Sequence, residues 1–336
     1  MTETELTDAI IRHSLELQRV SRFEEDRAEA ILRELERDLR ALLNNRNLST
    51  AGKREVEAII KQAQQAISGR YTNIAGILDV EAIAQHVADR TLEAMQGMFP
   101  SAAAPSLETL RSLSRDIIID GAPSSAWWAK QSDDTALNFA RAVRKGVING
   151  QTNEQIVRAV AGDMGVIGVS RRNARALVQT SIMTAANQAR LETFRKNSKF
   201  ASGIRWLATL DSRTCLRCSA LDGSVWDFDG KPLGETKLDM QFPPAHFACR
   251  CVLTVAPARS ALDELFPGLA DRIKAARDRA SASGPQKVTM SEWLQRNPAA
   301  AEEIMGKKRV EMFLAGKLTI TDLVTKSGRP KALAEL

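Results

Sequence analysis

The sequence predicts a mainly α-helical protein that contains a small α+β module and begins with a long N-terminal helical hairpin. Aromatic residues make up only 5% of the 336 residues. Ala, Leu, Arg and Glu dominate the first two hundred residues, as expected of helices that pack through small side chains. Between residues 203 and 255 the pattern changes to short apolar and aromatic pieces separated by Asp and Gly, which favours strands.

The predicted hairpin consists of two amphipathic helices. Apolar residues from Ala28 to Leu42 recur at three- and four-residue steps with Glu and Arg between them. After a polar break, Ser49 or Thr50 is expected to cap a second helix, whose apolar face runs from Val56 to Ile67. Each helix needs a partner for its apolar face, so the first seventy residues are expected to pair with each other.

The chain is expected to divide into consecutive parts. Two prolines in the loop PSAAAPS forbid a continuous helix there, SASGPQ is typical of a linker, and Thr289 with Glu292 forms a capping box that opens the last unit. The parts are a helical hairpin or extended helices at 1–100, a helical domain at 101–199, a β-rich module at 200–257, a helix and linker at 258–282, and a C-terminal helical unit at 283–336.

The helices expected within residues 101–199 are recognised by the residues at their ends. A helix is expected from Trp127 to Asn149, and the next one begins with a capping box formed by Thr152 and Gln155. A long helix follows at about 170–197. The two adjacent tryptophans at the start of the first helix are interpreted as core anchors.

The charge balance is only weakly basic. Lys and Arg total 47 against 41 Asp and Glu, which gives a net charge of +6. This small excess permits contact with nucleic acid but does not imply it. The N-terminus lacks the pattern of a signal peptide, and no run of eighteen apolar residues occurs, so we expect no membrane association and synthesis in a reducing cytoplasm.

All four cysteines lie between positions 215 and 251. Cys215 and Cys218 form a C-x2-C knuckle, and the later cluster HFACRC supplies His246, Cys249 and Cys251. In a reducing compartment such cysteines are poor disulfide candidates and good metal ligands. Zinc favours four thiolate or imidazole ligands, so four of these five residues are predicted to hold one structural Zn²⁺ ion. The spacing leaves four cysteines, or three cysteines with the histidine, as equal alternatives.

Signals for catalysis are weak, and we expect no enzymatic activity. A catalytic zinc needs an open coordination position and a nearby general base, whereas Asp211, Asp222, Asp227 and Asp229 are interpreted as turn residues. The sequence contains no phosphate-binding GxxxxGK[ST] or GxGxxG motif. The other histidines have no histidine or cysteine partner at ligand spacing and are expected to be packed or solvated.

The segments WLATLDSRTCLRCSALDGS and PPAHFACRCVLTV resemble the signature of the phage Mu F-like head morphogenesis family, the minor head proteins. The stretches VRKGVINGQTNEQIVRAV and VQTSIMTAANQARLETFRKN resemble the helices that precede it, although Gln179, Thr180 and Ser181 stand where many relatives have Arg-Thr-Glu. The C-terminal unit is also similar to that of some members. The signature positions are Trp206, Asp211, Arg213, Thr214, Cys215, Cys218, Leu221, Asp222, Gly223, Pro244, His246, Cys249, Arg250 and Cys251, and the helix matches at Asn187, Ala189 and Arg190.

The resemblance implies a component of the phage head, made in the cytoplasm of the bacterial host. It implies a structural protein at the portal vertex, with the portal and capsid proteins as partners and with phage DNA as a further candidate partner. The implied roles are capsid assembly, DNA packaging or DNA delivery, and the module at 200–257 is the zinc-binding, Mu F-like part.

Two other functions are weighed against this one. A zinc-containing DNA-binding protein would contact phosphates, but residues 199–256 hold seven Lys or Arg and six Asp or Glu, a net charge of only +1. An HNH-like nuclease would need paired histidines around a catalytic metal, and His246 is the only histidine near the module.

Overall fold

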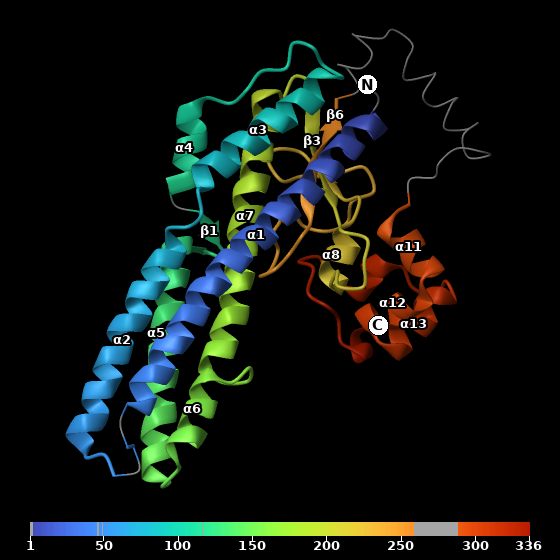
Figure 1. The fold of residues 1–336 in the computed structure, drawn as a ribbon. Helices are drawn as coiled ribbons and strands as arrows, with labels where there is room; N and C mark the ends of the chain where they lie inside the picture. The colour runs from blue at the N-terminus through green and yellow to red at the C-terminus, as the bar shows by residue number, and fades with distance from the viewer. Residues whose placement is uncertain (1–2, 46, 49, 116, 259–287) are drawn as a thin grey trace, which may run out of the picture. The chain divides into compact units, whose positions relative to one another are not determined.

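The computed structural model describes residues 3–45, 47–48, 50–115, 117–258 and 288–336, which are mainly helical with small antiparallel sheets (Figure 1). The described residues form two compact units. The first, here called the module unit, comprises the described residues among 3–15, 84–111, 185–258 and 288–336. The second, here called the helical unit, comprises residues 16–83 and 112–184. Helices α1 (Glu3–Asn44), α3 (Val80–Gln96), α4 (Leu107–Arg115) and α7 (Val166–Lys196) contribute residues to both units.

The two units alternate along the chain, whereas the sequence predicts consecutive parts. They alternate because long helices carry the chain from one unit into the other. The predicted boundaries stay predictions, and almost all of the helix and linker expected at 258–282 lies outside the described residues.

The helical unit is built around α2 (Lys53–Ala75), which packs closely along α5 (Ser124–Ile148) (Figure 1). At this contact the hydroxyls of Tyr71 and Thr135 lie 3.0 Å apart, and Glu57 pairs with Arg144 at 2.8 Å. The unit also contains α6 (Asn153–Ala161) and a small hairpin of β1 (Ile118–Ile119) and β2 (Ala122–Pro123).

Both helices of the predicted N-terminal hairpin are present as α1 and α2. Arg70 of α2 pairs with Glu34 and Asp38 of α1, at 2.5 Å and 2.8 Å. The closest packing partner of α2 is nevertheless α5, so the hairpin is part of a larger helical assembly and not a self-contained pair.

The predicted capping boxes at Thr152 and Thr289 are confirmed. The predicted cap of the second helix is wrong at Thr50, because α2 begins at Lys53 with Gly52 as its N-cap, and Ser49 lies outside the described residues. The carboxylate of Glu55 accepts the Gly52 N–H at 3.0 Å and replaces the missing side-chain cap.

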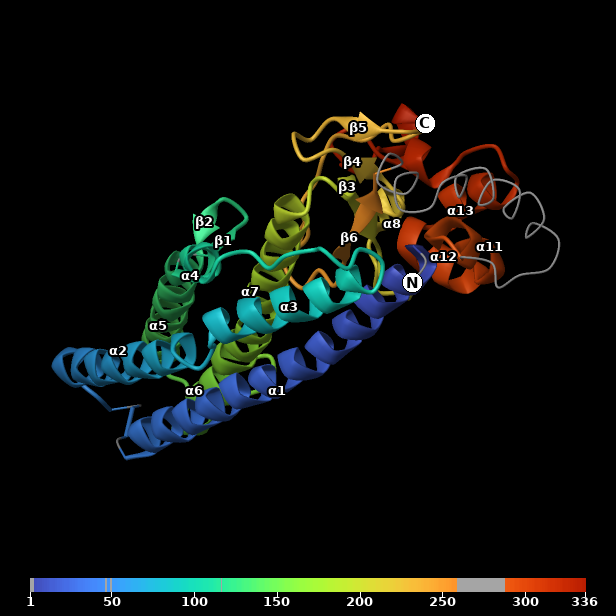
Figure 2. The same ribbon diagram turned by 90° about the horizontal axis from the view of Figure 1, so that it is seen from above.

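The module unit contains a four-stranded antiparallel sheet in the order β5-β4-β3-β6 (Figure 2). Its strands are β3 (Ala201–Leu207), β4 (Val225–Trp226), β5 (Pro232–Leu233) and β6 (Val252–Pro257). Three of them agree with the predicted strands. A side chain at Gly203 would place its Cβ 1.9 Å from the carbonyl oxygen of Trp226, so glycine is required for the close approach of β3 and β4.

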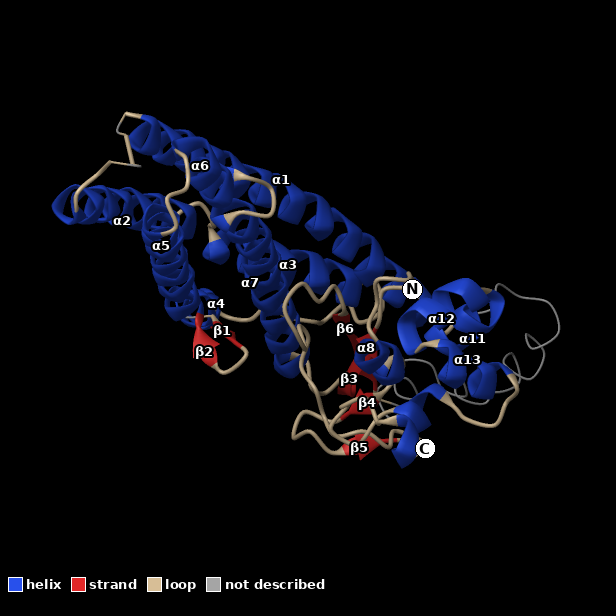
Figure 3. Cartoon of the chain, turned by 90° about the horizontal axis from the view of Figure 1, so that it is seen from below, coloured by secondary structure: helices blue, strands red, loops and turns tan. Residues whose placement is uncertain are grey.

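The C-terminal helices share a hydrophobic core with this sheet (Figure 3). Buried residues of the module, including Trp206 and Trp226, belong to the same cluster as Leu294 and Phe313. The elements that contribute to it are α8 (Leu216–Leu221), α11 (Met290–Arg296), α12 (Pro298–Met305), α13 (Lys307–Leu314) and the 3-10 helix η1 (Ile320–Leu323), and a second 3-10 helix, η2 (Leu333–Glu335), follows. Residues 290–324 therefore pack onto the module as part of its core.

Among the residues that the structure describes, no helix combines the length and the apolar character needed to cross a bilayer.

Candidate metal centre

Two chain segments bring the five candidate ligands together in the module unit. Cys215 is the N-cap of α8, and Cys218 lies in the first turn, where its N–H points to the Cys215 sulfur at 3.5 Å. His246, Cys249 and Cys251 lie in the irregular segment before β6. The N-cap position holds the first sulfur outside the helix and aims it back at the first turn.

Their ligand atoms form two overlapping groups. Cys215, Cys218 and His246 form one group, and Cys218, Cys249 and Cys251 form the other, with the atoms of each group within 4.8 Å of one another. Cys218 belongs to both groups. The structure therefore brings all five predicted residues to one place, with the Cys218 sulfur at its centre.

The distances agree with those around a tetrahedral ion. His246 Nε2 lies 3.3 Å from the sulfur of Cys215 and 3.3 Å from that of Cys218, and the Cys218 and Cys249 sulfurs are 3.7 Å apart. With Zn–S bonds of about 2.3 Å and Zn–N bonds of about 2.0 Å, a tetrahedron separates two sulfurs by about 3.8 Å and a sulfur from a nitrogen by about 3.5 Å. None of the four cysteines forms a disulfide.

The orientation of His246 suits metal binding. Its Nδ1 lies 2.8 Å from the carbonyl oxygen of Phe247 and can donate a hydrogen bond to it. That bond fixes the tautomer and leaves the Nε2 lone pair directed at the two sulfurs of the knuckle.

The acid–base properties of the cluster follow from the crowding of its thiols. The hydrogen bond with Cys218 lowers the pKa of Cys215 to about 4, and the same contact raises the pKa of Cys218 above its usual value. Hydrogen bonding to the Cys215 sulfur raises the pKa of His246 to about 10. A divalent cation bound here must displace protons from such groups, so metal binding is opposed by acid.

A half-buried ion pair holds the two ligand segments together. Arg250, between Cys249 and Cys251, donates two hydrogen bonds to the carboxylate of Asp211, four residues before Cys215. The Thr209 hydroxyl also donates to the Arg250 carbonyl oxygen at 3.2 Å. These contacts set the distance between the two segments independently of any metal.

The region that contains the candidate ligands matches the model of a known protein family. Residues 138–254 match the family model of Phage Mu protein F like protein. The match confirms the resemblance seen in the sequence, and it suggests a phage head morphogenesis protein. No curated protein and no solved structure matched the chain.

The Mu F-like region runs from α5 to β6 and includes all five candidate ligands. It also includes Asn187 of α7, which is fully buried and bonds to the segment that carries the last two cysteines. The Asn187 side chain accepts the Leu253 N–H at 3.0 Å and donates to the Cys251 carbonyl oxygen at 3.2 Å. Sequence reasoning reached this residue only through the family resemblance, because nothing in its local pattern shows that it meets β6.

The aspartates interpreted as turn residues have different roles. The Asp227 carboxylate accepts the N–H groups of Asp229 and Lys231, as expected of a turn. Asp222 accepts the Ala208 N–H and the Met290 N–H, both at 2.9 Å, and so connects the Mu F-like region to the start of α11. That second contact spans a long sequence separation, which no turn signal predicts.

The interpretation of the remaining histidines as packed or solvated is confirmed, because His13 is buried and His86 is exposed. Their rings lie 5.5 Å apart in the module unit, a contact between α1 and α3 that sequence spacing does not show. Arg90 Nε donates to His13 Nε2 at 3.0 Å. The Arg90 guanidinium therefore occupies the ring nitrogen that a metal ion would have to bind.

Proposed function

We propose that the chain is a non-enzymatic minor head protein of a tailed phage or prophage, present in the phage head at the portal vertex. It would act with the portal and capsid proteins in capsid assembly, DNA packaging or DNA delivery. The match of residues 138–254 to the Mu F-like family supports this proposal most strongly. The concentration of the candidate ligands within that region adds to it.

We further propose that the ligand cluster holds a structural Zn²⁺ ion through Cys215, Cys218, His246 and Cys249. Three of the six distances between these ligand atoms are close to the edges of a zinc tetrahedron. Cys251 remains beside Cys218 and Cys249 as the alternative fourth ligand. Bound zinc would join α8 to the segment before β6, and the binding free energy would contribute directly to the stability of the module.

The surroundings of the cluster favour a structural over a catalytic ion. A catalytic zinc needs a carboxylate or another base that is free to move a proton. The two nearest aspartates of the signature are engaged, Asp211 by Arg250 and Asp222 by the N–H groups of Ala208 and Met290.

The portal proposal is tested by co-expression of the full chain with the portal protein of the same phage, followed by size exclusion and mass determination. A stable complex is expected, with zinc in the same peak. Elution of the chain alone, with a DNA affinity that falls steeply as salt rises, would favour the DNA-binding alternative.

A surface variant sharpens this experiment. Within the helical unit, Phe23 of α1 is 63% exposed, and an apolar side chain of this kind suits docking into a groove of a partner. Phe23→Glu is expected to weaken the complex at least tenfold. Leu137→Glu on α5 is the matched control, because Leu137 is 55% exposed. Equal binding by both variants would show that Phe23 has no specific part in the contact with the portal protein.

A further inference from the structure

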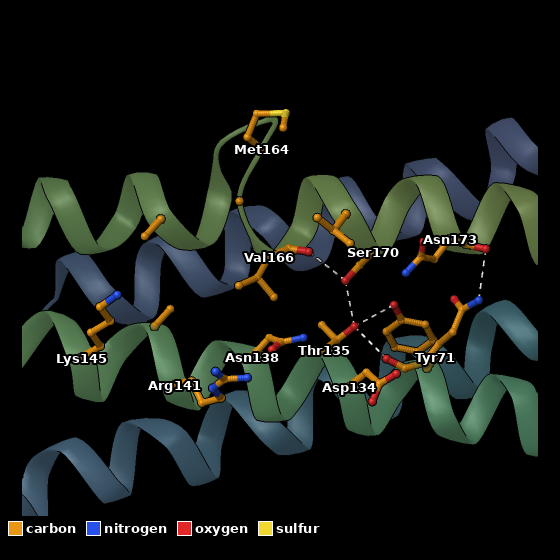
Figure 4. A pocket seen from close by; sticks show the side chains of 15 residues that line it. Tyr71, Asp134, Thr135, Asn138, Arg141, Lys145, Met164, Val166, Ser170 and Asn173 are labelled. Carbon is orange, nitrogen blue, oxygen red and sulfur yellow. Dashed lines mark hydrogen bonds between the residues drawn. The ribbon is translucent and has the colours of Figure 1, made fainter. Parts of the chain in front are cut away.

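The helical unit contains a polar cleft between α5 and α7, far along the sequence from the cysteines (Figure 4). Its volume is about 380 Å³, and Tyr71 of α2 lies against its inner wall. The hydroxyls of Tyr71 and Thr135 are 3.0 Å apart, and those of Thr135 and Ser170 are 2.8 Å apart. This chain of hydroxyls fixes the side chains of the wall.

Two cations beside the cleft have no carboxylate partner among the residues that the structure describes. Arg141 and Lys145 lie one turn apart on α5, are exposed and line the cleft. Within the described residues neither forms an ion pair, whereas their neighbour Arg144 pairs with Glu57. The acidic residue of the lining, Asp134, is paired with Lys130 at 2.5 Å. The cleft thus offers positive charge that the described residues do not neutralise.

Hydrogen-bond donors complement these cations. The side-chain amides of Asn138 on α5 and Asn173 on α7 project into the space between the two helices (Figure 4). Among the described residues, neither amide has a side-chain hydrogen-bond partner. Burial raises the pKa of Tyr71, so its phenol stays neutral and adds no negative charge.

Apolar side chains complete the lining. Met164 is 86% exposed and Val169 is 41% exposed, and Val166 lies beside them. An anionic group would contact Arg141, Lys145 and the Asn138 amide, while an organic portion would lie against these apolar side chains. A cleft with a cationic part and an apolar part matches a phosphate ester better than a metal cation or a wholly apolar ligand.

We propose that this cleft binds the phosphate group of a phosphate ester, with Arg141 and Lys145 supplying the charge. A phosphodiester of DNA and a small organic phosphate share this chemistry. The proposal does not depend on the zinc site or on portal association, because every residue involved lies in the helical unit.

The test measures binding of three probes to the full chain at constant ionic strength. They are inorganic phosphate, deoxythymidine monophosphate and a single-stranded DNA oligonucleotide. The variant Arg141→Gln/Lys145→Gln is expected to weaken binding at least tenfold. The matched control is Arg54→Gln/Lys61→Gln on α2, which removes the same charge from exposed positions outside the cleft and is expected to retain wild-type affinity.

The outcomes are distinguishable. If the two small probes bind and the oligonucleotide does not, the ligand of the cleft is a small phosphate ester. If the oligonucleotide also binds and competes with both small probes, the ligand is the DNA backbone. The proposal is overturned if the wild-type chain prefers phosphate no more than chloride. It is also overturned if the control variant loses as much affinity as the cleft variant.

Discussion

Arg250 donates hydrogen bonds of 2.5 Å and 2.7 Å to the two carboxylate oxygens of Asp211, and this pair joins the two chain segments that supply the candidate ligands. The Arg250 side chain is only 12% exposed, so the pair is shielded from solvent more than a surface ion pair would be. We therefore infer that the Asp211–Arg250 pair holds the two segments in register before metal binds.

Asp211→Asn should destabilise the module by about 1–2 kcal/mol, because Asn has one acceptor oxygen where the carboxylate has two, so one hydrogen bond from Arg250 and the attraction between opposite charges are lost. Chemical unfolding followed by tryptophan fluorescence measures the effect, since Trp206 and Trp226 are in the module core. Asp229→Asn is the control, because Asp229 is exposed. Equal stabilities of the two variants would show that the ion pair does not hold the module.

The same pair predicts a pH dependence. Burial alone would raise the pKa of Asp211, but hydrogen bonding and attraction from Arg250 outweigh it, and the pKa lies below its usual value. Its contribution to stability is thus present above the unfolded-state pKa of about 3.9 and is lost as the pH falls through the folded-state pKa. The stability difference between wild type and Asp211→Asn should be constant near neutral pH and shrink below about pH 4. A difference that grows in acid would reverse the assigned sign.

Asn187→Ala tests the link between α7 and β6. The substitution removes the acceptor of the Leu253 N–H and the donor to the Cys251 carbonyl oxygen in a fully buried site. We expect a loss of about 2–3 kcal/mol, since a buried N–H and a buried carbonyl oxygen are left unsatisfied. Hydrogen exchange should locate the loss at β6. Unchanged protection of the Leu253 amide would contradict the contact.

Asp222→Ala tests the attachment of the C-terminal helices. It removes the acceptor of the Met290 N–H at the start of α11, and faster exchange of the α11 amides is expected, with a cost of about 1–3 kcal/mol. Asp227→Ala is the comparison, because its carboxylate serves only the local turn. If both variants leave α11 equally protected, the shared core alone holds the C-terminal helices.

The sequence predicts the parts of this structure that depend on local spacing. The knuckle at Cys215 and Cys218 and the capping box at Thr152 are recognisable because their partners lie within three residues. The family resemblance likewise rests on a local signature and is confirmed over residues 138–254.

Contacts between distant segments could not be predicted. The pairing of Asp222 with Met290 and the meeting of His13 with His86 depend on the tertiary packing of separate helices. Strand β5, at Pro232–Leu233, lacks the β-branched and aromatic residues by which the equally short β4 is predicted, and its proline disfavours a strand. The choice between Cys249 and Cys251 as the fourth ligand likewise depends on three-dimensional position, which sequence spacing does not show.

The most direct test of the zinc account is native mass spectrometry of the purified chain and of two single variants. We expect about one zinc ion per wild-type chain, loss of most of it in Cys218→Ser, and retention in Cys251→Ser. Chelation should also make residues 206–255 sensitive to protease while the helical unit stays protected. A wild-type chain that contains no zinc yet resists protease in this region, or full zinc in Cys218→Ser, would contradict the account.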